Sequence, residues 1–344
     1  MSLKPTVIVD PHFRRMDEIF DQQHRDRLYD LVEVIWGKDE PMPQDDFLRA
    51  LPDALAVVCA DWRYGNEALA SAANLRAILT VSGGFPRNLD YDACFARGIR
   101  VLSAAPAFAH SVAEMALALA LAASRDIPGG DRAMRAGNEK WLHAGNADAF
   151  MLFGKPVGFI GYGSIARSLH PLIAPFGCPI SVYDPWLTDG TLRTFGVEPV
   201  ELDRLLESSK VIFVLAAPSV ENRALLSRER LERIQPGAVL VLVSRAHVVD
   251  FDALTDLVLA GRFKAAIDVF PTEPLESNHP IRKAEGAILS AHRAGPTVEG
   301  CHEIGEMLVD DLVAITRGLP PQRMQNAQPE LIARYMTNTI RKTS

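Results

Sequence analysis

Glycine and small residues stand at three spaced positions in the stretch GFIGYGSIA, and this spacing is one that binds phosphate groups. Gly161, Gly163 and Ala166 follow an apolar run that predicts a strand, and they open a run that predicts a helix. In that context Gly161 permits a tight turn, Gly163 permits close approach of a pyrophosphate, and Ala166 permits close packing of helix on strand. The N–H groups at the start of the helix, at Ser164 and Ile165, then face the anion.

An acidic residue follows at the distance that this interpretation requires. Asp184 ends the next apolar run, 21 residues after Gly163. An acid at that position accepts hydrogen bonds from ribose hydroxyls and repels a 2′-phosphate, and the next residue is Pro185 rather than an arginine. The sequence therefore predicts a dinucleotide site that takes NAD in preference to NADP. The alternative is a turn without a ligand and an aspartate at the surface.

The elements that must position this turn alternate between strands and helices. Short β-branched or apolar runs predict strands buried on both faces, at 6–10, 54–61, 75–84, 155–163, 179–184, 210–218, 238–246, 263–271 and 287–292. Helical patterns are expected at 13–36, 106–125, 164–177 and 297–316, with a polar loop at 128–148 and a polar tail at 317–344. This alternation predicts an α/β protein with parallel sheets.

The composition restricts the class of protein and the kind of partner. A chain of 344 residues is long enough for two domains, and 48% hydrophobic with 23% charged residues is typical of globular proteins. A net charge of -7 disfavours an electrostatic grip on nucleic acid or on an anionic membrane. A small-molecule partner is therefore expected.

Neither the cysteines nor the N-terminus points to export. The four cysteines lie far apart with no C-x-x-C pair, which predicts neither a metal site nor a disulfide framework and fits a reducing cytoplasm. The N-terminus lacks the basic and apolar regions of a signal peptide. The apolar stretch 115–124 is too short to cross a bilayer and is expected to be a buried or interface helix.

Taken in order, several motifs make the chain resemble the D-isomer-specific 2-hydroxyacid dehydrogenase family over most of residues 54–318. The motifs are GGFPRNLD, GFIGYGSIA, APSVENRALL, VLVSRAHVVD, AAIDVFPTEP and LSAHRAG. The resemblance implies two Rossmann-like domains with parallel sheets. Both chain ends, 1–104 and 294–344, would form a flavodoxin-like substrate domain, and the inserted 105–293 would be the NAD-binding Rossmann domain, with the active site in the cleft.

By position, the resemblance assigns catalytic roles to Arg245, Glu273 and His292. The guanidinium of Arg245 suits the carboxylate and ketone oxygens of a 2-oxo acid, which it would hold and polarise. His292 would give a proton to the oxygen as hydride arrives at the carbonyl carbon, and would remove it in the reverse direction. Glu273 would orient the imidazole and stabilise its charged form.

The resemblance also implies contacts to the cofactor and to the substrate carboxylate. Ala217, Pro218 and Asp268 join the glycine turn as cofactor-binding residues, with Asp268 near the nicotinamide. The backbone N–H groups of the loop Ser82, Gly83 and Gly84 would bind the carboxylate. The alternative for this loop is a turn that two glycines make without a ligand.

The implied activity is an NAD(H)-dependent oxidoreductase that reduces a 2-oxo acid to a D-2-hydroxy acid. No metal is implied, and a homodimer through the 106–125 helix region is expected. The chain departs from the family pattern at Phe85 and Arg87 in the loop after Gly84, and at Ala246 and His247 after the arginine. These departures leave substrate choice open.

Two other functions stay open. One is a dinucleotide-sensing interaction protein similar to the family's corepressors, with little or no turnover. The other is oxidation of a smaller anion, as in the family's formate and phosphite enzymes, although LSAH lacks the glutamine partner expected of that branch.

Overall fold

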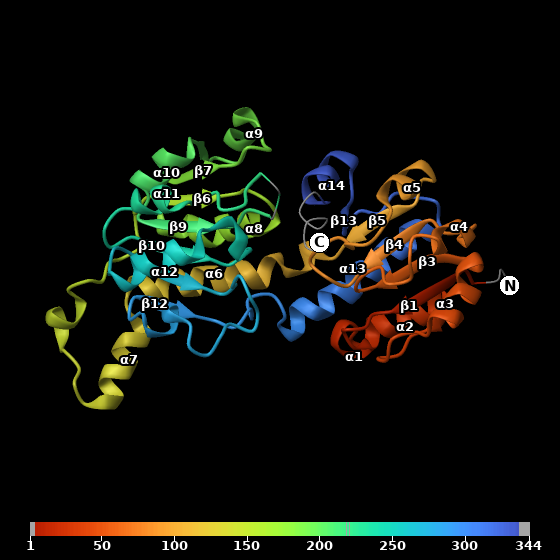
Figure 1. Ribbon diagram of the computed structural model, residues 1–344, viewed down its shortest axis with the longest axis horizontal. Helices are drawn as coiled ribbons and strands as arrows, with labels where there is room; N and C mark the ends of the chain where they lie inside the picture. The colour runs from red at the N-terminus through yellow and green to blue at the C-terminus, as the bar shows by residue number, and fades with distance from the viewer. Residues whose placement is uncertain (1–3, 218, 220, 337–344) are drawn as a thin grey trace. The chain divides into compact units, whose positions relative to one another are not determined.

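The chain forms two compact units in the computed structural model, which describes residues 4–217, 219 and 221–336. Unit 1 consists of Met1–Ala109 and Pro296–Ser344, and unit 2 is the inserted segment His110–Gly295. The division therefore falls after residues 109 and 295, where the sequence placed it after 104 and 293. Each unit is built on its own sheet (Figure 1).

Unit 1 contains a six-stranded sheet in the order β13-β5-β4-β3-β1-β2. Its neighbours are parallel except the short pair of β13 with β5. The strands are β1 (Thr6–Asp10), β2 (Glu33–Trp36), β3 (Ala54–Cys59), β4 (Ala77–Thr80), β5 (Arg100–Ser103) and β13 (Gln325–Asn326). The five parallel strands have the order of a flavodoxin-like sheet, which confirms the expected class.

Alternate residues of the central strands enter two different cores, because side chains of a strand point to opposite faces. Val7 and Val9 pack with Leu308 on one face, whereas Ile8 packs with Phe47 on the other. Helices cover these faces; they are α1 (Met16–Ile19), α2 (Gln22–Leu31), α3 (Gln44–Ala50), α4 (Ala68–Ser71), α5 (Tyr91–Ala96), α13 (Val298–Thr316) and α14 (Pro329–Met336), with 3₁₀ turns η1 (Leu51–Asp53) and η2 (Ala105–Phe108).

The prediction of one long helix over 13–36 is wrong. The segment holds α1, α2 and the strand β2, which pairs with β1 in parallel. Phe20 ends the first helix, and Asp21 caps the second, since its carboxylate accepts the N–H of His24 at 2.7 Å. The tail expected after 316 likewise contains ordered elements, β13 and α14.

Unit 2 contains a parallel seven-stranded sheet in the order β12-β11-β10-β9-β6-β7-β8. Its strands are β6 (Val157–Ile160), β7 (Ile180–Tyr183), β8 (Glu198–Pro199), β9 (Val211–Val214), β10 (Val239–Leu242), β11 (Lys264–Ile267) and β12 (Ala287–Leu289). The strand order reverses between β6 and β9: from β6 the chain first adds strands on one side and then, from β9, on the other. This is the strand order of a Rossmann sheet, and it confirms the expected fold. All four residues of β6, β9 and β10 are buried.

Helices flank this sheet and complete its core. They are α6 (Ala109–Ser124), α7 (Ile127–Ala136), α8 (Ser164–Ile173), α9 (Asp189–Thr194), α10 (Leu202–Ser208), α11 (Arg228–Glu232) and α12 (Phe251–Leu259), with 3₁₀ turns η3 (Leu142–Asn146), η4 (Ala174–Phe176), η5 (Ala246–Val248) and η6 (Pro280–Lys283). One core cluster packs residues of α10 and α12 against alternate residues of β9 and β10.

The segment 128–148 is not the loop that the sequence predicts. It contains α7, which has Pro128 in its first turn, ends at the left-handed Gly137 and projects away from the sheet of unit 2 (Figure 1). Before it, Ala105–Ser124 is long and apolar enough to cross a membrane by length and composition. The prediction that the apolar stretch is too short to cross a bilayer is therefore wrong. Half of this span is buried inside the protein, and a core helix passes the same test.

Candidate active site

Three neighbouring strands of unit 2 bring the residues of the expected catalytic set to one edge. β10, β11 and β12 are adjacent and parallel, so their carboxyl ends lie side by side. Arg245 comes three residues after β10, Glu273 follows β11 in the loop before η6, and His292 follows β12. This is the edge at which open α/β sheets bind ligands.

The imidazole of His292 is joined directly to the carboxylate of Glu273. Nδ1 of His292 lies 2.6 Å from Oε2 of Glu273, and Oε1 accepts the N–H of Phe270 at 2.9 Å. Because an ionised carboxylate only accepts, Nδ1 carries the hydrogen of this bond. Nε2 is thereby left as the ring atom available to a ligand. The side chain of His292 is 42% exposed and that of Glu273 is 37% exposed.

The surroundings keep Glu273 charged. Burial by itself would raise the pKa of the Glu273 carboxyl, but the hydrogen bonds from His292 and Phe270 and the charges of His292 and Arg245 together hold it below its usual value. The guanidinium of Arg245 therefore lies within electrostatic reach of the pair. An imidazole, an arginine and a carboxylate share one small region.

Asp268 holds the turn that carries His292. Its side chain is fully buried; Oδ1 accepts the N–H of Arg293 at 2.9 Å and Oδ2 accepts that of Ala294 at 3.1 Å. Its carbonyl accepts the N–H of His292 at 2.8 Å. His292 has a φ of 51°, a left-handed conformation that residues other than glycine adopt at a cost of about 1–2 kcal/mol. The buried carboxylate offsets this cost and fixes the ring's direction.

Arg245 extends from the strand end into solvent. It is exposed, begins the turn η5, and its Nη1 donates to the carbonyl of Ser244 at 2.7 Å. Ser244 is 6% exposed, and its hydroxyl has no partner in the part of the chain that the structure describes. A buried hydroxyl without a partner is costly, so Ser244 is a candidate contact for a ligand, which the sequence analysis missed.

The glycine turn lies at the same edge, after β6. Gly161 has a φ of 92°, and a Cβ there would lie 2.7 Å from the Cα of Ala216, so only glycine fits. Gly163 has an ordinary φ and nothing within 4 Å of the place of a Cβ. The fold thus requires the first glycine, whereas the second leaves open space in front of the helix.

That space faces the start of α8. Gly163 is the N-cap, no side chain caps the helix, and the N–H groups of Ser164 and Ile165 have no acceptor among the described residues. Helix starts with free N–H groups and open space are suited to an anion. This arrangement fits the pyrophosphate of a dinucleotide.

Asp184 stands beside the turn, after β7. Its Oδ2 accepts the N–H of Tyr162 at 2.7 Å and its Oδ1 that of Trp186 at 2.8 Å. Each carboxylate oxygen keeps a second lone pair, so the side chain can still accept hydroxyl groups while it fixes the glycine turn. The backbone contact of Tyr162 was not apparent from the sequence.

The remaining cofactor positions follow β9. Ala217 lies two residues beyond Leu215, and its carbonyl accepts from the side chain of Asn222 at 2.6 Å. Pro218 lies outside the described residues.

The loop assigned to the substrate carboxylate belongs to unit 1, after β4. The hydroxyls of Thr80 and Ser82 both donate to the carbonyl of Gly84, at 3.0 and 3.1 Å, which folds the loop on itself. The N–H groups of Ser82, Gly83 and Gly84 have no acceptor in the described ranges. Such neighbouring free N–H groups form an anion-binding nest.

The departures from the family pattern in this loop have structural partners. Phe85 is half-buried against the core of unit 1. The backbone N–H of Arg87 donates to Asp61 at 3.0 Å, and Asp61 also accepts the N–H of Trp62. The two loops after β3 and β4 are therefore tied together.

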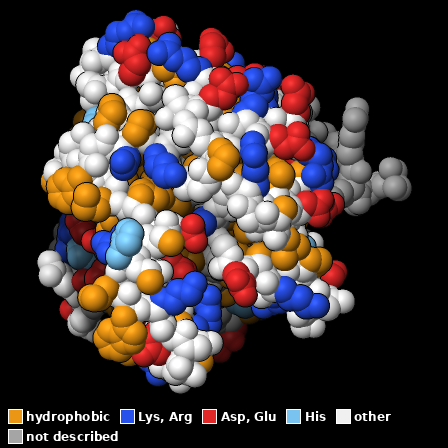
Figure 2. Space-filling view, turned by 90° about the vertical axis from the view of Figure 1, so that its left-hand side faces the viewer, with side chains coloured by type: hydrophobic (Ala, Val, Ile, Leu, Met, Phe, Trp, Pro, Cys, Tyr) orange, Lys and Arg blue, Asp and Glu red, His pale blue; other side chains and the backbone are white. Residues whose placement is uncertain are grey.

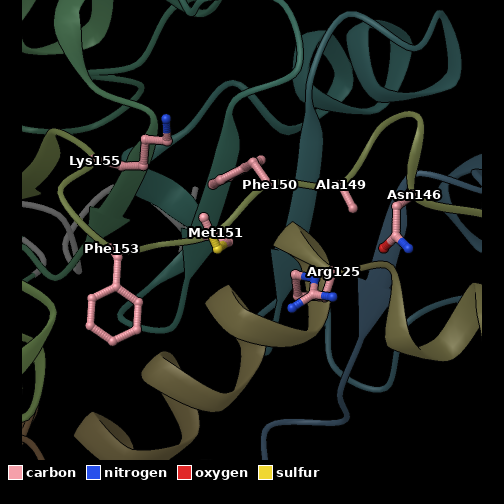
Figure 3. A pocket seen from close by; sticks show the side chains of 7 residues that line it. All are labelled: Arg125, Asn146, Ala149, Phe150, Met151, Phe153 and Lys155. Carbon is pink, nitrogen blue, oxygen red and sulfur yellow. The ribbon is translucent and has the colours of Figure 1, made fainter. Parts of the chain in front are cut away.

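A hollow of about 430 Å³ in unit 2 lies apart from these residues. Arg125, Phe150 and Lys155 line it with residues of the segment before β6 (Figure 3). It is thus placed before the sheet's amino ends rather than after its carboxyl ends. Among the described residues, no group of three or more His, Cys, Asp or Glu side chains is arranged to hold a metal.

Comparison with known proteins gives a family match over more than half of the chain. Residues 117–294 match the D-isomer specific 2-hydroxyacid dehydrogenase, NAD binding domain. The expected cofactor, NAD, is therefore the one that this domain is named for. The segment contains the glycine turn and all three residues of the expected catalytic set.

Relatives match both units. The D-3-phosphoglycerate dehydrogenase of Mycobacterium tuberculosis is 35% identical over 282 residues, 81% of this chain and 52% of that protein. The chain thus spans about half the length of that relative. The glyoxylate reductase of Thermofilum pendens is 30% identical over 305 residues, 86% of this chain and 88% of that protein. A phosphoglycerate oxidoreductase from Rhizobium etli has a TM-score of 0.83 at 36% identity, with 94% of this chain and 99% of that chain covered.

Alanine at the two glycines separates folding from cofactor binding. Gly161→Ala is expected to destabilise unit 2 by about 2–5 kcal/mol, because its Cβ meets backbone and its φ is left-handed. Gly163→Ala is expected to cost at most about 1 kcal/mol, the loss of a favourable N-cap. It should nevertheless weaken NADH binding at least tenfold by filling the space before the helix. Urea unfolding measures the first effect, and fluorescence titration with NADH measures the second. Unimpaired NADH binding by folded Gly163→Ala would refute the proposed phosphate-binding role of this turn.

Removal of one Asp268 oxygen tests the turn at His292. In Asp268→Asn an amide group faces a backbone N–H, which leaves one buried donor unpaired and should lower the free energy of unfolding by about 1–3 kcal/mol. The control is Asp256→Asn, which breaks an exposed ion pair with Arg228 and should cost under about 1 kcal/mol. Equal losses in the two variants, measured by urea unfolding, would show that Asp268 does not hold this turn.

Proposed function

Because the chain belongs to the D-isomer specific 2-hydroxyacid dehydrogenase family, we propose that it reduces a small 2-oxo acid to a D-2-hydroxy acid with NADH. The observation that carries this proposal is the 2.6 Å contact of His292 with Glu273, at the sheet edge that also holds Arg245. A proton donor, a carboxylate and a forked cation at one edge form the set that ketone reduction requires.

In this proposal Arg245 binds and polarises the substrate. A guanidinium offers two parallel N–H donors, which match a carboxylate and the adjacent ketone oxygen of a 2-oxo acid. Arg245 is exposed and extends from the turn after β10, so a ligand can reach it. Its positive charge also favours the negative charge that develops on the ketone oxygen during reduction.

His292 supplies the proton. The Nδ1–H bond to Glu273 fixes the ring, so that a proton on Nε2 points away from the carboxylate and toward a ligand. Glu273 stays ionised and stabilises the imidazolium before the proton is given. In the reverse direction the neutral ring accepts the proton of the hydroxy acid.

The cofactor supplies the hydride that reduces the carbonyl carbon. The chain's own part is to hold it: the N–H groups at the start of α8, which have no acceptor among the described residues, bind pyrophosphate, Asp184 binds ribose hydroxyls, and Ala217 borders the site. The buried hydroxyl of Ser244, which has no partner in the described part of the chain, gives a further polar contact near Arg245. From unit 1, we propose that Ser82, Gly83 and Gly84 bind the substrate carboxylate through their N–H groups.

A substrate screen tests the proposal. Glyoxylate, hydroxypyruvate, pyruvate and bulkier 2-oxo acids are each mixed with NADH or NADPH, and absorbance of the reduced nicotinamide is followed. We expect oxidation of NADH with at least one acid and a product of D configuration. A folded protein that binds NADH and reduces none of these acids would overturn the proposal and favour a sensor.

Replacement of Glu273 tests the proton donor through pH dependence. Ketone reduction needs a protonated donor, so kcat/KM is expected to fall at high pH, where the donor has lost its proton. In Glu273→Gln the imidazolium loses its carboxylate partner, and this falling limb is expected to move to lower pH, with kcat at neutral pH reduced about 10²-fold. His292→Ala should lose kcat by a similar or larger factor and keep its NADH affinity. An unmoved limb in Glu273→Gln would contradict the assigned role.

We also propose a homodimer formed through α6 and the segment that follows it. Large apolar side chains more than half exposed gather in this segment: Ile127, Met134, Trp141, Leu142, Met151 and Phe153. Such exposed groups mark surfaces that another protein covers. Figure 2 shows one face of the molecule on which hydrophobic side chains lie in patches between charged ones. A second copy of the chain covers this segment symmetrically in the proposal.

Sedimentation velocity measures the assembly. The wild type is expected to sediment with twice the chain mass of 37.7 kDa. Trp141→Glu combined with Leu142→Glu should shift it toward monomer, because two charges would be buried in the interface. Leu319→Glu, an exposed apolar position in unit 1, is the control and should leave the mass unchanged. A monomeric wild type at micromolar concentration would exclude this dimer.

A further inference from the structure

His247, two residues after Arg245, takes part in a hydrogen-bond network that the proposed reaction does not use. Its ring is half-buried in the turn η5, and Nε2 lies 3.2 Å from Oδ1 of Asn222. The pKa of His247 is lowered, first by burial and then by the charges of Arg245 and Arg223, so the ring is neutral. Since an amide oxygen only accepts, Nε2 carries the ring's hydrogen and donates it.

Asn222 in turn closes the loop that follows β9. Its Oδ1 also accepts the N–H of Ser219 at 2.9 Å, its Nδ2 donates to the carbonyl of Ala217 at 2.6 Å, and its own N–H donates to Oγ of Ser219 at 3.2 Å. The amide's orientation is fixed by these partners, because only the oxygen can accept from a backbone N–H. Asn222 thus bonds to two described residues of the loop 217–222, Ala217 and Ser219.

This loop is adjacent to the glycine turn. β9 pairs with β6 along its whole length, and Ala216 is the residue whose Cα lies 2.7 Å from the place of a Cβ on Gly161. The residues gathered by Asn222 thus continue directly from the backbone that packs on the phosphate-binding turn. The sequence assigned Ala217 of this loop to the cofactor.

Backbone hydrogen bonds join the residues just after this loop to the segment that follows Arg245. The carbonyl of His247 accepts the N–H of Ala224 at 2.7 Å, and the carbonyl of Val248 accepts that of Leu226 at 3.0 Å. His247 therefore contacts this segment through both its ring and its carbonyl. Hydrogen bonds of side chain and backbone therefore join the two segments at His247.

We propose that His247 and Asn222 are positioning residues that couple the Arg245 turn to the cofactor loop 217–222. The pair, which we call the Asn222–His247 latch, touches no reacting atom. It holds the loop in the arrangement that receives the dinucleotide, and it ties that arrangement to the position of Arg245. This inference rests on the proposed function for its catalytic consequence, but the latch itself is a property of the protein without ligand.

A mutant cycle tests the latch with a matched pair of substitutions at one position. His247→Leu removes the donor and keeps an apolar side chain, whereas His247→Gln keeps an amide N–H donor. Loss of one such bond is expected to raise the Kd for NADH about fivefold. KM for glyoxylate should rise similarly in His247→Leu, with kcat changed less than twofold, and His247→Gln should restore both to within twofold of wild type. In an Asn222→Ala background, His247→Leu should have no further effect.

Amide hydrogen exchange of the unliganded protein gives the test that needs no activity. Exchange in the peptide that spans 217–226 is expected to quicken at least fivefold in His247→Leu and to match wild type in His247→Gln. Equal exchange in all three proteins would overturn the latch, as would additive effects of the two substitutions on the Kd for NADH. Failure of the proposed function is distinguishable, because it would appear as absent reduction of every acid while the exchange pattern is as expected.

Discussion

The buried carboxylate of Asp268 is the constraint on which the candidate active site depends. Its two oxygens take the N–H groups of Arg293 and Ala294, so the chain leaves β12 in a sharp turn with His292 in the left-handed region. Buried polar groups are stable only when paired, and this pairing gives one geometry to the turn. Nδ1 of the imidazole is thereby directed to Glu273, and the ring stays partly exposed with Nε2 available to a ligand.

Electrostatics then give the site its chemical character. Glu273 is kept ionised by hydrogen bonds and by the nearby charges of His292 and Arg245, although burial opposes this. The charged carboxylate of Glu273, hydrogen-bonded to the imidazole of His292, favours a ring that can hold and release a proton. The arginine attracts an anion to the same edge. At the other strands of this edge, the N–H groups at the start of α8 that have no acceptor among the described residues provide a second positive region.

Features encoded locally were predictable from the sequence, whereas those that depend on tertiary contacts were not. The spacing of Gly161, Gly163 and Asp184 and the short apolar runs correctly located the turn and the strands of unit 2 other than the two-residue β8, because backbone geometry and burial on both faces each restrict residue type. Strand β2 was missed because its four residues, one exposed and three half-buried, follow closely after a helix and continue its pattern. Helix α7 was missed because Pro128 and two glycines resemble a loop, although proline is suited to a first helical turn. The contacts of Asp268 join segments that only the folded sheet brings together.

A crystal structure of the complete protein with NAD and the unreactive 2-oxo acid analogue oxamate is the most direct measurement of the central claim. The account predicts oxamate with its oxygens on the guanidinium of Arg245 and one of them within hydrogen-bond distance of Nε2 of His292. It also predicts the dinucleotide's pyrophosphate at the start of α8. Oxamate bound away from Arg245 and His292, with the dinucleotide in place, would contradict the account.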